Sequence, residues 1–347
     1  MLRNHARPNE RPEDCTVEAV RVESKALRGN PWGDPTDREL IAVLPPGYHD
    51  DAKRRYPVLW LLAGYYGSGR MSLNRNYSSP AIDERVGKLI LQKKMPPVIL
   101  ALPDCMTALG GSQYLDSPAM GNYESYLCDE LIPAFDATFR TIPTREGRGV
   151  LGKSSGGYGA LRLAMRRPEL FAAAASHSGD CYFEYCHVKD FPSAVNAIRN
   201  AGGVKELIDK IRATEKPKND DTLALINIAM GACYSPRKGA PLGFDLPFDE
   251  TTGELNEKVM NRWFENDPVR MVENKQYADA LRSLNLLFLD CGTRDQWALH
   301  LGLRIFVERL KQLGIRYEHE EFDDDHMSIS YRYDRSIPLL AKALAKS

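Results

Sequence analysis

Short apolar runs alternate with amphipathic stretches along most of the chain. Three runs are strongly apolar, namely Pro57–Ala63, Pro97–Pro103 and Gly149–Gly152. Apolar runs of this length, bounded by turn residues, are typical of buried strands. Their alternation with helical patterns favours parallel βαβ units over an all-β or all-α domain. We therefore expect an α/β fold with a mostly parallel central sheet and helices on both faces.

Further elements follow from the same pattern. The helical spacing of Tyr126, Leu127, Leu131 and Phe135 predicts a helix, and Gly314 is a usual helix stop. The additional strands that we expect are Thr16–Ala26, Glu39–Leu44, Phe171–Ser176, Leu284–Asp290 and Arg316–Phe322, and the helices are Ala160–Arg167, Tyr123–Phe139, Trp297–Leu313 and Arg335–Lys346.

The pattern changes between residues 180 and 266, where aromatic and helical pieces are interrupted by prolines. This stretch is too long for a loop between neighbouring strands. We interpret it as a helical cap or lid over the carboxyl edge of the sheet. The chain is then one domain, residues 1–347, with an insertion at 180–266.

Composition excludes several partners. The 347 residues carry 46 Lys and Arg against 47 Asp and Glu, and this balance offers no global attraction to nucleic acid or anionic membrane. Residues 1–14 lack the apolar core of a secretory signal, and no run approaches the roughly 18 apolar residues of a membrane span. We expect a cytoplasmic protein. Its seven cysteines show no C-x-x-C spacing, so we expect reduced thiols.

The most informative segment contains G-x-S-x-G, from Gly152 to Gly156. In a nucleophile elbow, a serine at this position lies on a sharp strand-to-helix turn, and the flanking glycines keep the turn free of side chains. A strand-like run precedes the motif and a helical run follows it. The context therefore predicts that Ser154 is a catalytic nucleophile.

The same residues allow a second interpretation. Gly147–Ser154 also fits G-x-x-x-x-G-K-[ST], the phosphate-binding loop of nucleotide-binding proteins. That loop needs a strand before its first glycine, whereas Thr141–Glu146 is polar and contains Pro143. The elbow is the favoured interpretation.

A serine nucleophile needs a histidine base and an orienting acid, which follow it in the order Ser, Asp or Glu, His in this fold. Asp295 follows the strand Leu284–Asp290 across a turn, and His326 follows the next strand. We predict these two residues as the partners of Ser154, with Asp290 as the alternative acid. The acidic run Asp323–Asp325 is more typical of a solvated loop than of a metal site, so we predict neither metal nor organic cofactor.

The oxyanion hole needs two backbone donors. We predict the N–H groups of Ser155, directly after the nucleophile, and of Tyr65, in the loop after an earlier strand. The predicted substrate pocket adds Gly64, Tyr66, His177 and Trp297. His177 is equally consistent with a packed, hydrogen-bonded histidine.

With these pieces in place, the chain resembles the putative-esterase family of α/β-hydrolases, which includes esterase D-like S-formylglutathione hydrolases, feruloyl and enterochelin esterases, and mycolyltransferases. The segments that carry the resemblance are Leu44–Tyr48, Tyr56–Gly64, Asn122–Tyr126, Glu130–Pro133, Gly152–Ala160, Gly292–Asp295 and His326. The resemblance implies the same triad and the same oxyanion donors. The chain departs from the family pattern at Ala63, Lys153 and Asp325, where the family usually has His, His and Gly.

The sequence thus predicts a serine carboxylesterase that hydrolyses small to medium soluble esters through an acyl-enzyme. An acyltransferase would use the same triad, with another alcohol in place of water. A nucleotide-binding protein and a non-catalytic binding module remain as further alternatives.

Overall fold

A mostly parallel sheet forms the centre of the computed structural model, which describes residues 15–75 and 79–345. The described residues contribute eight strands in the order β1-β2-β4-β3-β7-β8-β9-β10. Their bounds are β1 (Thr16–Glu23), β2 (Asp37–Leu44), β3 (Val58–Leu62), β4 (Ile99–Pro103), β7 (Arg148–Lys153), β8 (Ala173–His177), β9 (Leu286–Gly292) and β10 (Glu318–Phe322). β2 is antiparallel to β1 and to β4, and the other pairs are parallel. The expected α/β architecture is confirmed.

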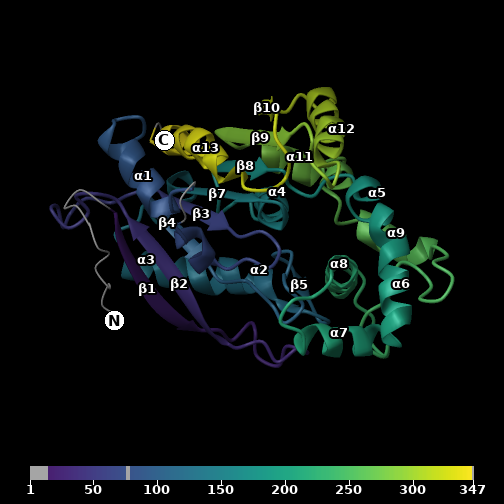
Figure 1. Cartoon of the computed structure of the whole chain (residues 1–347). Helices are drawn as coiled ribbons and strands as arrows, with labels where there is room; N and C mark the ends of the chain where they lie inside the picture. The colour runs from purple at the N-terminus through teal and green to yellow at the C-terminus, as the bar shows by residue number, and fades with distance from the viewer. Residues whose placement is uncertain (1–14, 76–78, 346–347) are drawn as a thin grey trace.

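The sheet buries both faces because successive side chains of a strand point to opposite sides. In β3, Val58, Trp60 and Leu62 join one core, whereas Leu59 and Leu61 join the other. Helices cover the two faces (Figure 1). The face of Leu59 is covered by α1 (Ile82–Leu91) and α13 (Tyr333–Leu344), and the opposite face by α3 (Ile132–Thr138), α4 (Ser155–Arg166), α11 (Lys275–Arg282) and α12 (Leu299–Gln312).

The helix expected over Tyr123–Phe139 is one helical run of three parts. It consists of α2 (Tyr123–Ser125), the π-helical segment η2 (Tyr126–Leu131) and α3. Pro133, near the start of α3, has no N–H to donate to the preceding turn. The turn before it is wider than an α-turn, and the N–H of Ile132 bonds the carbonyl of Leu127. The predicted helix is thus present with a local change of pitch.

The first strand ends at Glu23 rather than at Ala26. The next residues turn away from the sheet to bind the carboxylate of Glu130. Ser24 donates its hydroxyl at 2.5 Å, and the N–H groups of Lys25 and Ala26 each donate at 2.9 Å. These bonds replace the ladder bonds that a longer strand would make.

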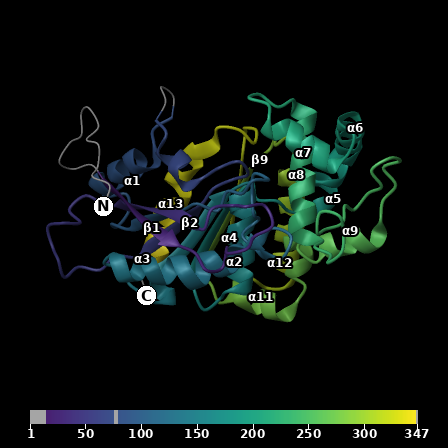
Figure 2. The ribbon, with the colours of Figure 1, turned by 90° about the horizontal axis from the view of Figure 1, so that it is seen from below.

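Helices also fill the long connection between β8 and β9, residues 178–285, which we call the helical insertion. Its helices are α5 (Phe183–Cys186), η4 (Val188–Asp190), α6 (Phe191–Ala201), α7 (Val204–Arg212), α8 (Asn219–Tyr234), α9 (Glu257–Phe264), α10 (Pro268–Met271) and α11. Figures 1 and 2 show α6, α7 and α8 standing beyond one end of the sheet. The stretch 180–266 lies within this insertion.

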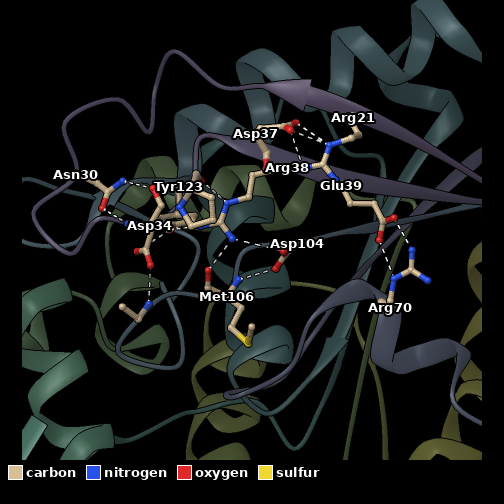
Figure 3. A network of polar contacts seen from close by, with 12 residues as sticks. Arg21, Asn30, Asp34, Asp37, Arg38, Glu39, Arg70, Asp104, Met106 and Tyr123 are labelled. Carbon is tan, nitrogen blue, oxygen red and sulfur yellow. Dashed lines mark hydrogen bonds and ion pairs between the residues drawn. The ribbon is translucent and has the colours of Figure 1, made fainter. Parts of the chain in front are cut away.

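A buried polar network fixes the loop after β4 (Figure 3). Arg38 is only 4% exposed and reaches this loop from β2, donating to the carbonyl of Met106 at 3.0 Å and pairing with Asp104 at 3.4 Å. The second terminal nitrogen of Arg38 donates to the hydroxyl of Tyr123 at 3.0 Å. In the same network, Asp34 accepts from the N–H of Ala108 at 2.6 Å. The loop that continues to residue 115 therefore has a rigid base.

Three expectations concern a membrane span, a metal site and the state of the cysteines. Within residues 15–75 and 79–345, no helix combines the length and apolarity of a membrane span. The same residues hold no cluster of three or more His, Cys, Asp or Glu that could bind a metal ion. No disulfide joins the cysteines, and all but Cys15 are buried. Residues 1–14, which underlie the argument against a secretory signal, lie outside the described residues.

Candidate active site

Ser154 lies at the sharp turn between β7 and α4. Its backbone angles are φ 58° and ψ −129°, a region that non-glycine residues seldom adopt. A Cβ on Gly156 would come within 2.2 Å of the Leu62 carbonyl oxygen, and one on Gly152 within 2.4 Å of the Gly156 backbone. The turn is thus strained and needs both glycines, as expected for an elbow.

The alternative phosphate-binding loop is excluded by the same segment. Residues 148–153, which would have to form the open loop, are the buried strand β7. Their backbone groups pair with β3 and β8. They therefore cannot surround a phosphate.

Asp295 and His326 are brought together from the ends of β9 and β10. His326 Nδ1 lies 2.7 Å from Asp295 Oδ2, and each residue is 5% exposed. The loop is held further by Gln296, whose side-chain oxygen accepts from the His326 N–H at 3.0 Å. The imidazole therefore has one nitrogen fixed by a carboxylate and the other, Nε2, left for chemistry.

The electrostatics of Asp295 favour its ionised form. Burial alone would raise the pKa of this carboxyl, but hydrogen bonds from His326 and from the Trp297 and Leu299 N–H groups outweigh burial and lower the pKa below its ordinary value. One of these, from the Trp297 N–H to Oδ1, measures 2.9 Å. A carboxylate that stays charged can stabilise an imidazolium.

Asp290, the alternative acid, is engaged elsewhere. It is fully buried, and its two oxygens contact His177 Nδ1 at 2.6 Å and Arg332 Nε at 2.8 Å. His177 contacts Ser336 through its second nitrogen at 2.7 Å. The prediction that His177 borders the pocket is therefore wrong, because both ring nitrogens are used in the core, where the side chain is 1% exposed.

The carbonyl of His177 still contributes to the elbow. It accepts the N–H of Ser154 at 2.9 Å. The histidine thus supports the strained turn through its backbone, at a position where its side chain is fixed by Asp290 and Ser336.

A cavity of about 330 Å³ opens over the elbow. The sequence-predicted residues that line it are Ser154, Ser155, His326, Gly64, Tyr65, Tyr66 and Trp297, whereas Asp295 lies behind His326. The Trp297 ring packs against the His326 ring with 4.8 Å between centroids. The structure therefore gathers every predicted pocket residue except His177.

The cavity also contains residues that sequence reasoning did not assign. These are Lys153, Asp180, Cys186, His187, Leu299, Met327 and, from α8, Asn219, Thr222, Leu223, Ile226 and Met230. Asp180 could have been found, because it follows the strand next to the nucleophile by three residues. The α8 residues carried no such signal, because they come from a helix whose docking position no local pattern specifies.

Burial shifts the pKa values of three titratable groups that line the cavity. Burial lowers the pKa of Lys153, although Asp295 and Asp325 act in the opposite direction. Burial also lowers the pKa of His187 to about 3, so that this ring is neutral at pH 7. Burial raises the pKa of Asp180 to about 6.

Comparison with solved structures shows the fold. A ferulic acid esterase superposes with a TM-score of 0.61 over 95% of this chain and 99% of its own, at 18% identity. An S-formylglutathione hydrolase from Agrobacterium tumefaciens gives a TM-score of 0.60 over 95% and 96%, at 17% identity. The expected α/β-hydrolase fold is thereby confirmed.

Sequence relatives cover part of the chain. Esterase Rv1288 of Mycobacterium tuberculosis is 32% identical over 165 residues, which are 46% of this chain and 31% of the relative. An endo-1,4-beta-xylanase/feruloyl esterase of Xylanibacter ruminicola is 28% identical over 198 residues, 52% of this chain and 26% of the relative. The chain thus aligns with about a third or less of the length of these curated relatives.

A family model described as "Putative esterase" matches residues 35–327. This range includes the elbow, the turn with Asp295 and the loop with His326. Because the match spans most of the chain and the fold agrees with it, the chain belongs to this esterase family.

Proposed function

We propose that the chain is a serine carboxylesterase that hydrolyses small to medium esters through Ser154, His326 and Asp295. The observation that carries the proposal is that Ser154 and His326 line the same cavity, while Asp295 is hydrogen-bonded to Nδ1 of His326. Membership of the esterase family supports it.

Ser154 attacks the ester carbonyl carbon while Nε2 of His326 takes the hydroxyl proton. The tetrahedral intermediate collapses as the bond to the alcohol oxygen breaks, and His326 returns the proton to that oxygen. Water, with His326 again as base, then attacks the acyl-enzyme and releases the acid and Ser154. Asp295 stabilises the imidazolium in both steps.

The oxyanion of each intermediate binds the N–H groups of Tyr65 and Ser155. The next N–H of the same loop, that of Tyr66, is already bonded to the Gly110 carbonyl at 3.0 Å. Gly64 brings this loop close to the elbow, because a Cβ there would lie 3.5 Å from Cβ of Ser154. Ser155 begins α4, where helix N-terminal N–H groups favour negative charge.

The size of the cavity supports small or medium substrates. Its volume of about 330 Å³ lies near the lower end of the roughly 300–1,000 Å³ typical of ligand pockets. Tyr65, Ile226, Leu299 and Trp297 give it apolar walls. Such a cavity can hold the acyl chain of a small or medium ester, but it is too small for a polymer.

Fluorophosphonate labelling tests the proposal directly. The reagent phosphonylates an activated serine, and peptide mass spectrometry locates the label. We expect modification at Ser154, slowed strongly in His326→Gln, and unchanged labelling in Ser155→Ala, since the donor there is a backbone group. A label elsewhere, or none on the folded protein, would show that the elbow does not hold an active nucleophile.

A further inference from the structure

Asp180 is a carboxylate in the cavity that the ester mechanism does not use. It follows β8 after Ser178 and Gly179, lines the cavity, and is 7% exposed. It is the one carboxylate among the described residues that line this cavity. The fully buried Asp290 is paired with the cation of Arg332, whereas Asp180 is held by the neutral amide of Gln113 at 3.1 Å.

The support for Asp180 is built under strain. Gln113 and Tyr114 are consecutive non-glycine residues with positive φ, at 50° and 54°. This turn points the Gln113 amide nitrogen at Asp180 Oδ2 and at the Tyr234 hydroxyl, 2.9 Å away. The Gln113 amide oxygen is buried without a partner. Strain and an unsatisfied group near a cavity are typical of a site kept for a ligand.

Gln113 donates to Oδ2 of Asp180, and no side chain or backbone N–H of residues 15–75 and 79–345 donates to Oδ1. A buried carboxylate with an open oxygen is stabilised by any donor that a ligand brings. The burial that raises its pKa to about 6 leaves it ionised at pH 7.5. The open oxygen is then an acceptor only.

The surrounding charges favour a neutral donor over a cation. Lys153 lines the same cavity from the elbow, and both His326 and its carboxylate partner Asp295 interact electrostatically with Asp180. His187, from the insertion, is neutral. A substrate ammonium bound to Asp180 would meet the imidazolium that forms on His326 in each step, whereas a hydroxyl avoids this repulsion.

The strand order indicates which part of the ester lies next to Asp180. The oxyanion loop follows β3, on one side of β7, and Asp180 follows β8, on the other side. β9 and β10, which carry Asp295 and His326, lie beyond β8. The leaving oxygen must face His326, so the alcohol part of the ester lies on the side of Asp180.

We propose that Asp180 accepts a hydrogen bond from a hydroxyl group on the alcohol part of the substrate, so that the enzyme prefers esters of diols or polyols to plain alkyl esters. This specificity rests on the proposed function and names the substrate class of the same site.

A matched pair of substrates tests this preference. In 2-hydroxyethyl butanoate a hydroxyl replaces the terminal methyl of propyl butanoate. At pH 7.5 we expect the wild type to favour the hydroxyl ester in kcat/KM by about ten-fold or more, as for one hydrogen bond to a charged group. In Asp180→Leu we expect this ratio to fall close to one.

Asp190→Leu is the matched control. Burial raises the pKa of Asp190 also, but this residue does not line the cavity. We expect its substrate ratio to equal that of the wild type. Fluorophosphonate labelling of each variant reports an intact elbow, and Asp180→Asn, which keeps the shape of the side chain, replaces Asp180→Leu if the latter does not fold.

Three results would overturn the proposal. One is a wild-type ratio near one, and another is a ratio that Asp180→Leu and Asp180→Asn leave unchanged. The third is a stronger Asp180-dependent preference for butyrylcholine over its uncharged analogue 3,3-dimethylbutyl butanoate, which would assign the site to cations. Hydrolysis of propyl butanoate with Ser154 labelled would leave the esterase function standing in each case. Absence of both would overturn the function and this inference together.

Discussion

Asp180 destabilises the folded protein at neutral pH. Its pKa rises from 3.8 to about 6 on folding because of burial. The folded state therefore holds the proton up to about pH 6, whereas the unfolded state releases it near 3.8, so folding stability falls as pH rises between these values. Above pH 6 the full cost of about 3 kcal/mol is present.

The variant Asp180→Asn removes this cost. We expect its free energy of unfolding to exceed that of the wild type by about 1–3 kcal/mol at pH 8, and the gain to disappear near pH 4. Urea unfolding at both pH values measures the difference. A variant that is less stable than the wild type at pH 8 would mean that the carboxylate is better compensated than its contacts indicate.

Gly156 is needed by the close approach of β3 to the elbow. We expect Gly156→Ala to lower stability by about 2 kcal/mol or more, because the new methyl would lie 2.2 Å from the Leu62 carbonyl oxygen. Fluorophosphonate labelling should slow as the turn shifts. Gly29→Ala serves as the control, since φ is +70° there but no atom lies within 4 Å of the new Cβ. It should cost about 1 kcal/mol and leave labelling unchanged.

Site residues that belong to a short sequence motif, or that directly follow a strand, could be predicted from the sequence. The elbow around Ser154 needs glycines at fixed offsets, and His326 and Asp295 follow recognisable strands. His177 was ambiguous because its environment depends on Asp290 and on Ser336, 159 positions later. No local pattern reports such a partner, so a core histidine and a pocket histidine look alike in sequence.

At the scale of elements, the loop from Asp104 to Leu115 links the fold to the site. Arg38 holds its start, Gly110 and Gly111 pack against the Tyr65 ring, and Gln113 holds Asp180. The loop has short strands only beyond this range, at β5 (Asp116–Ser117) and β6 (Gly121–Asn122). Side-chain contacts and a few backbone bonds, such as that from the Tyr66 N–H to the Gly110 carbonyl, therefore position it in place of a strand ladder.

Removing the buried guanidinium should loosen this loop. We expect Arg38→Met to lower the free energy of unfolding by about 3 kcal/mol, because Asp104 loses its cation and the Met106 carbonyl and Tyr123 hydroxyl lose a buried donor. Arg21→Met breaks the pair with Asp37, in which both side chains are at least half exposed, and should change stability far less, because solvent screens an exposed pair. Equal effects of the two substitutions in thermal unfolding would contradict a structural role for the buried network.

Strand and helix positions were largely predictable because the apolar runs are short and bounded by Pro and Gly. The bounds that differed have tertiary causes, as at the end of β1, where Glu130 captures the backbone. The helix α1 was not predicted. The wide turn of η2 also had no signal beyond Pro133.

At the scale of the whole molecule, the helical insertion completes the cavity. Helix α8 supplies five of its lining residues, and Figure 2 shows this helix beside the sheet end that carries the site. The sequence predicted an inserted segment from its length and prolines. It could not specify which helix would dock over Ser154, because α8 is apolar on several sides and most of its residues are buried.

The insertion should set the length of the acyl chain. We expect Ile226→Trp to reduce kcat/KM for p-nitrophenyl octanoate by about ten-fold or more and to leave the acetate ester nearly unaffected, because the added ring fills part of the cavity. Asp220→Trp places the same ring on the exposed surface of α8 and should change neither rate. A uniform loss on both esters for Ile226→Trp would place the acyl chain elsewhere.

We have proposed Ser154 as the nucleophile of an esterase. The most direct measurement is the rate of p-nitrophenyl butanoate hydrolysis by the wild type and by Ser154→Ala, purified in parallel and matched in thermal unfolding. We expect turnover by the wild type and a fall in kcat of about 10⁴-fold or more in the variant. Equal rates for the two proteins would contradict it.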